Sequence, residues 1–180
     1  MFQGDVTLSA SVTLGRVGFG LRPFSAIRAF QQHSADGVGE RQRMTEPLNH
    51  HEALFYVMVA SSAVDRAMTD DEFARIGEMV SNLPVFADCD EEGLVKAAEA
   101  CGKILSTDDG LQQMVRLVRE ALPEKLRETA YCVALEVAAA DRRVRPGEIF
   151  FLDMLGDALG LDRTTTAAFE RCIRARNMTL

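Results

Sequence analysis

An internal repeat with an offset of 76 residues constrains the fold of this chain more than any other feature of its sequence. The stretches "VDRAMTDDEF" (64–73) and "ADRRVRPGEI" (140–149) each place Asp-Arg after an apolar run and a Glu seven positions after the Asp. The apolar residues on either side also match in register. Such a repeat predicts that one supersecondary unit occurs twice. Two copies are too few for a solenoid, so we expect two helix–loop–helix halves packed around a pseudo-two-fold axis.

Apolar residues with helical spacing dominate from Pro47 onward, and no stretch alternates as a strand would. Residues 53–64 are apolar almost throughout, which predicts a helix at the centre of the molecule. The chain is therefore predicted to be an all-α bundle of about seven helices. We expect them at about residues 48–64, 70–83, 90–106, 109–122, 123–140, 146–159 and 163–176.

Residues 1–43 differ from the rest of the chain. They are rich in Gly, Ser and Arg and show weak periodicity, whereas Met44 opens a stretch that resembles a natural protein start. We expect residues 1–43 to be a disordered or non-native N-terminal extension, and residues 44–180 to form one helical domain. This interpretation leaves open whether residues 1–43 are translated.

The charge is acidic and unevenly distributed. The chain has a formal net charge of −7, and the acidic excess lies after residue 43. An acidic domain is poorly suited to nucleic acid. No stretch reaches the ~18 apolar residues of a membrane span, and no secretory signal opens the sequence. We expect a cytoplasmic protein without an integral span; peripheral membrane association and a homodimer stay open.

The acidic residues of the two repeat loops have two interpretations. "TDDE" (69–72) is a capping box, and "RPGE" (145–148) places Pro at the first helical position and Glu at the third. Both glutamates would then serve helix starts. Alternatively, Asp65, Glu72, Asp141 and Glu148 could offer oxygen ligands to a shared, weak cation site, because Ca²⁺ and Mg²⁺ prefer oxygen.

Glu136 interrupts the apolar run "YCVALEVAAA" (131–140). A Glu on an apolar helix should be paired or protonated. We expect an ion pair with an arginine such as Arg142 or Arg143. The alternative is that Glu136 is an accessory ligand of the same cation.

The cysteines and histidines give no catalytic or zinc pattern. The four cysteines form no C-x-x-C pair, and all three histidines lie within the first 51 residues. We expect no catalytic residues and no enzyme activity, and no cofactor is indicated apart from the possible Ca²⁺ or Mg²⁺ ion of the repeat loops. A hydrolase or redox enzyme using Cys132 or Cys172 is kept as an outlying alternative.

The run "EIFFLDML" (148–155) predicts an exposed apolar face, because its four consecutive apolar residues cannot all point inward. We therefore take Phe150 and Phe151 as the candidate interaction face. A dimer or another docking surface would use it.

Residues 50–175 resemble the TerB-like (tellurite-resistance protein B) family. The resemblance rests on the paired "AxDxxhxxxE" loops, in which h is apolar, on "LPEKLRETAY" (122–131), and on the repeat spacing. It implies a small helical bundle with duplicated halves and a role in resistance to tellurite and other stresses. Partners would be other tellurite-resistance or stress proteins. The alternative is an interaction scaffold or co-chaperone-type module without metal, since related domains occur in membrane-attached J-domain co-chaperones.

The family's acidic loop residues, considered a divalent-cation site, fall on Asp65, Glu72, Asp141 and Glu148. Here Arg66 and Arg142 stand where the family usually has Gly. Arginine brings a positive charge beside each carboxylate, which weakens the cation hypothesis for this sequence. An internal Asp–Arg pair could replace the ion.

Overall fold

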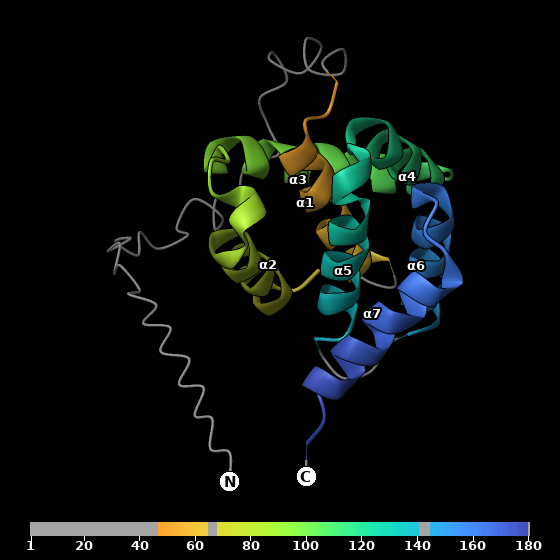
Figure 1. Cartoon of the computed structure of the whole chain (residues 1–180). Coiled ribbons are helices and arrows are strands. Elements are labelled where there is room, and N and C mark those ends of the chain that lie inside the picture. The colour runs from red at the N-terminus through yellow and green to blue at the C-terminus, as the bar shows by residue number, and fades with distance from the viewer. Residues whose placement is uncertain (1–46, 65–67, 141–144, 180) are drawn as a thin grey trace, which may run out of the picture.

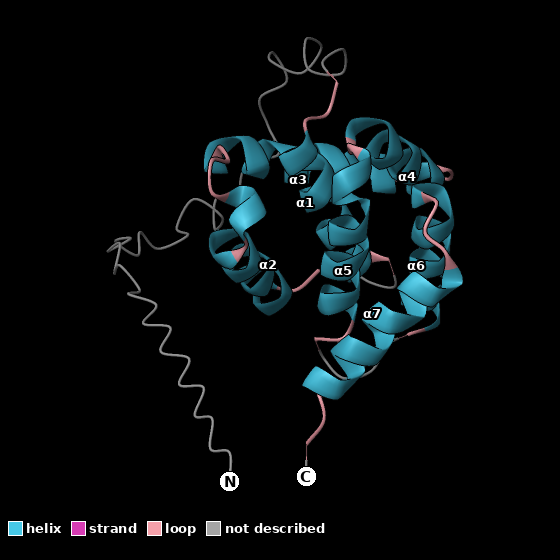
Figure 2. Ribbon diagram, in the orientation of Figure 1, coloured by secondary structure: helices cyan, strands magenta, loops and turns pink. Residues whose placement is uncertain are grey.

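The computed structural model describes residues 47–64, 68–140 and 145–179. Within these ranges the chain forms α-helices and two short 3₁₀ turns, η3 and η4, and no strand (Figures 1 and 2). This confirms the all-α prediction; the pseudo-two-fold arrangement stays a prediction. The elements are α1 (His50–Ala63), α2 (Asp70–Asn82), η3 (Pro84–Phe86), α3 (Glu91–Leu105), α4 (Gly110–Ala121), η4 (Glu124–Leu126), α5 (Arg127–Ala138), α6 (Pro146–Leu159) and α7 (Arg163–Arg176).

Helix α1 is the centre of the bundle, as its apolar sequence predicts. Every residue from Ala53 to Ser62 is buried. The helix packs against α5, α3 and α4, and Figure 1 shows it behind α5, with α2 and α6 on opposite sides. A helix that is apolar on all faces must be covered on all faces, which explains why five helices, α2 to α6, contact it.

Helix α5 begins later than the sequence predicts. Pro123 was expected at its first position, but the backbone there is extended, with ψ of 150°. The 3₁₀ turn η4 follows, closed by the amide of Leu126, which donates to the Pro123 carbonyl over 2.9 Å. The α-helix then starts at Arg127. Proline therefore precedes the helix here and does not open it.

The link between α6 and α7 fixes the direction of the last helix. Gly160 ends α6 with φ of +71°, a left-handed conformation that glycine adopts without strain. The amide of Leu161 donates back to the Gly156 carbonyl over 3.0 Å. Asp162 then caps α7 by accepting from the amides of Thr164 and Thr165. These caps turn the chain so that α7 lies against α5 (Figure 1).

None of the helices within the described ranges combines the length and apolar character that crossing a membrane requires.

Candidate functional site

Glu72 and Glu148 each stabilise the start of their own helix. The amide of Thr69 donates to Glu72 Oε2 over 2.8 Å, and the amide of Arg145 donates to Glu148 Oε2 over the same distance. Thr69 Oγ1 also accepts from the amide of Glu72, which completes a capping box at α2. Arginine has no acceptor, so only the glutamate half of the box exists at α6. The two helix starts, 76 residues apart, thus share the glutamate that accepts the amide three residues before it.

The described carboxylates do not form a cation site by themselves. Within the described residues, no group of three or more His, Cys, Asp or Glu side chains is placed to hold a metal. Glu148 is buried beside Arg145, whose guanidinium lies 3.9 Å from its Oε1. Asp65, Asp141, Arg66 and Arg142 lie outside the described residues. A shared site between the loops would depend on these two aspartates.

Glu136 pairs with an arginine that the sequence did not single out. Its Oε1 lies 2.8 Å from Nη1 of Arg176, near the end of α7. The side chains are 27% and 67% exposed, so the pair lies at the rim of the α5–α7 contact. The expectation of an arginine partner is met, but Arg142 and Arg143, the two candidates, lie outside the described residues. Arg176 thus supplies the positive charge that a Glu on an apolar helix was expected to pair with.

An exposed apolar pair lies at the start of α6. Ile149 is 50% exposed and Phe150 is 60% exposed, while Phe151 is fully buried. Phe150 therefore lies on the expected interaction face, but Phe151 does not; Ile149 takes its place. The reason is helical geometry: Phe151 and Leu152 turn into the core, so the two preceding residues turn out.

The comparison with protein families decides what kind of chain this is. The family model described as Tellurite resistance protein TerB matches residues 51–171. The chain belongs to the TerB family. No curated protein and no solved structure matches it significantly. Membership makes this chain a tellurite-resistance-type domain and agrees with the all-helical bundle.

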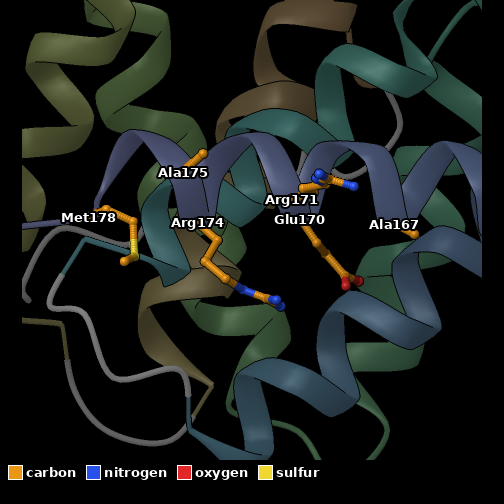
Figure 3. A pocket seen from close by; sticks show the side chains of 6 residues that line it. All are labelled: Ala167, Glu170, Arg171, Arg174, Ala175 and Met178. Carbon is orange, nitrogen blue, oxygen red and sulfur yellow. The ribbon is translucent and has the colours of Figure 1, made fainter.

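Helix α7 of the TerB domain carries an open hollow of about 520 Å³. Its lining comes from α7 and the residues just after it: Ala167, Glu170, Arg171, Arg174, Ala175 and Met178. In Figure 3 the carboxylate of Glu170 and the guanidinium of Arg174 extend to the same side of the helix. Ligand pockets of enzymes are usually enclosed by several elements. A hollow with a lining from one helix is a surface feature.

Burial raises the pKa values of several titratable groups of this TerB domain. It raises the pKa of the Cys101 thiol to about 12. Burial, followed by the charge of Glu170 and a hydrogen bond to it, raises the pKa of Tyr131 to about 12. The pKa of Cys132 is also raised, chiefly by burial and then by the charges of Glu136 and the neighbouring Cys172. Arg176 lowers this pKa, but by less than the other groups raise it.

The sequence analysis missed the role of His51. Its Nε2 lies 2.9 Å from the Val85 carbonyl and 3.5 Å from an oxygen of Asp88, so it joins α1 to η3. Asn49 and Glu52, which flank His50 and His51, form a second complete capping box, in which each side chain bonds the other residue's backbone amide. The spacing of Asn49 and Glu52 is a recognisable signal for that box. Nothing in the sequence pattern points to Val85.

Proposed function

We propose that this TerB-family chain is a non-catalytic domain of the tellurite-resistance type that works in the cytoplasm by binding a protein partner. The observation that carries the proposal is the exposure of Ile149 and Phe150, at 50% and 60%, side by side on the first turn of α6. Exposing large apolar side chains to water costs free energy, which a partner that covers them would recover, and contiguous exposed apolar patches mark interaction sites.

The chemistry of the described groups supports a non-catalytic role. Burial raises the pKa values of three groups and so favours their neutral forms: the thiols of Cys101 and Cys132 and the phenol of Tyr131. Catalytic nucleophiles and bases usually need the opposite shift or a pKa near neutral. Glu72 and Glu148 bond helix-start amides. The two glutamates therefore serve the helix starts, and burial leaves the other three groups without the lowered pKa of a catalytic nucleophile.

The neighbours of the apolar pair define the chemistry of the partner. Asp153 and Asp157 lie one and two turns further along α6 and are exposed. A partner that covers Ile149 and Phe150 with an apolar side chain would meet these carboxylates next. We infer a partner segment with an apolar anchor flanked by lysine or arginine, carried by another tellurite-resistance or stress protein.

Tellurite tolerance of host cells tests this function. We expect the chain to raise tolerance, and the double variant Ile149→Ser/Phe150→Ser to lose that gain while keeping its helical content and unfolding midpoint. Met178→Ser is the matched control, because Met178 is also exposed, at 72%, but lies beyond the end of α7. Full tolerance in the double variant would refute the docking face. Sedimentation of wild type and double variant shows whether the partner is a second copy of the chain.

A weak divalent-cation site between the two repeat loops is the second candidate. The observation that favours it is the equivalent placement of Glu72 and Glu148 at the starts of α2 and α6. Unfolding in EDTA, then with Ca²⁺ or Mg²⁺, tests it. A bound cation would stabilise the fold by about 2.7 kcal/mol at a hundredfold excess over its Kd. The variant Asp65→Asn/Asp141→Asn should lose that gain. Equal unfolding midpoints with and without the ions would exclude the site.

A further inference from the structure

Helices α5 and α7 run in the same direction along their contact. The hydroxyl of Tyr131 donates to Oε1 of Glu170 over 3.3 Å. Further along both helices, Glu136 pairs with Arg176 over 2.8 Å. Residue numbers rise along both helices from the first contact to the second. The side chains that lie between the two contacts on the facing surfaces are therefore neighbours.

Cys132 and Cys172 occupy this stretch. Cys132 comes four residues before Glu136 on α5, and Cys172 comes four residues before Arg176 on α7. Residues four apart lie on the same face of a helix, one turn from each other. The two thiols therefore face the same contact, one turn before the ion pair. Electrostatics agrees, since Cys172 is one of the groups that raise the pKa of Cys132.

The two thiols differ in access. Cys172 is exposed and Cys132 is half-buried, and both are free thiols. A reagent in solution meets Cys172 first. Helix α7 is the last helix in the described part of the chain, and it packs mainly against α5. A disulfide requires the two sulfur atoms to come within about 2.0 Å of each other, so its formation tests how closely α7 can bring Cys172 to Cys132.

We propose that Cys132 and Cys172 form a redox-active thiol pair that small disulfide compounds oxidise to an intramolecular disulfide. The Cys172 thiolate attacks one sulfur of the small disulfide and expels a thiolate. Cys132 then loses its proton and attacks Sγ of Cys172, which expels the second thiolate. In total the protein gives up two protons and two electrons, and the small disulfide is reduced to two thiols.

The bridge would tie α7 to α5. It would close a loop of about 40 residues that contains all of α6, including Ile149 and Phe150. Closing a loop of this length lowers the entropy of the unfolded chain and stabilises the folded one. Cys132 is half-buried, so it reacts second, once the exposed Cys172 carries the mixed disulfide. Proximity then favours the internal attack.

The test is to incubate the reduced, folded full-length chain with oxidised glutathione and to map its peptides by mass spectrometry. We expect a peptide pair linked through Cys132 and Cys172, and an unfolding midpoint higher by about 5 °C that dithiothreitol reverses. Cys132→Ser should retain glutathione on Cys172. Cys89→Ser is the matched control, because Cys89 is also half-buried. It should form the bridge as wild type does.

Two results would overturn the proposal. One is wild-type chain that keeps glutathione on Cys172, or forms dimers linked through Cys172, without the internal bridge. The other is a bridge that appears only after denaturant is added, because the two thiols would then meet in the unfolded chain and not across the α5–α7 contact.

Discussion

The guanidinium of Arg176 lies 2.8 Å from the carboxylate of Glu136, which joins the last turn of α7 to α5. Arg176 is 67% exposed and Glu136 is 27% exposed, so water screens the pair. Exposed ion pairs contribute about 0–1 kcal/mol. We therefore expect Glu136→Gln and Arg176→Gln to lower the free energy of unfolding by less than about 1 kcal/mol each.

A double-mutant cycle in urea measures this pair. The coupling energy should be below about 1 kcal/mol and should fall in high salt, as expected for a screened pair. A coupling of several kcal/mol, or one that salt does not change, would show that the pair is shielded from water.

Ser61 and Ser62 are adjacent buried serines with different surroundings. The hydroxyl of Ser61 donates to the Ala134 carbonyl over 2.8 Å and so ties α1 to α5. The hydroxyl of Ser62 has no hydrogen-bond partner among the described residues. We expect Ser61→Ala to destabilise the fold by about 1 kcal/mol, and Ser62→Ala to be neutral or stabilising. Urea unfolding of the two variants, side by side, checks this, and equal losses would contradict it.

Gly102 and Gly110 should respond in opposite ways to alanine. A Cβ at Gly110 would fall on the carbonyl oxygen of Ile104, whereas a Cβ at Gly102 meets nothing within 4 Å. Gly102 lies inside α3, where alanine is favoured by about 0.5–1 kcal/mol. Gly102→Ala should therefore raise the thermal midpoint, and Gly110→Ala should lower it. A midpoint for Gly110→Ala at or above that of wild type would contradict the close approach.

The sequence predicted local features better than contacts between distant segments. The seven α-helices within the described residues follow from apolar spacing, and the helix-start bonds of Glu72 and Glu148 follow from the short motifs that surround them. Arg176 could not be named as the partner of Glu136, because only the packing of α7 on α5 brings them together. The run 149–152 is entirely apolar, so no polar residue marks which side of α6 faces solvent.

Asp162 caps α7 and should make its stability pH-dependent. The pKa of Asp162 is lowered mainly by hydrogen bonds from the backbone and then the side chain of Thr165. Hydrogen bonds from Thr164 lower it further. The stabilisation is therefore present above the unfolded-state pKa of 3.8 and is lost as the pH falls through the lower pKa of the folded state. Asp162→Ala should lower the thermal midpoint at neutral pH and approach wild type in acid. A constant difference across this range would contradict a role for the charge.

Glu148 should matter more to stability than Glu72, although both accept an amide of their own helix start. Glu148 is buried, so removing it leaves the amide of Arg145 without that acceptor in a place with little water. Glu72 is only half-buried. We expect Glu148→Ala to cost about 1–3 kcal/mol and Glu72→Ala about 0.5–1 kcal/mol in urea unfolding.

Repeating these two measurements in EDTA and in millimolar Ca²⁺ separates helix capping from cation binding. If capping is the role of both glutamates, each loss is the same in the two conditions, because the amides of Thr69 and Arg145 are the groups that lose their partner. If the glutamates hold an ion, the losses grow in Ca²⁺, since only the wild type is then stabilised by binding. Losses that grow in Ca²⁺ would thus contradict a purely structural role at the two helix starts.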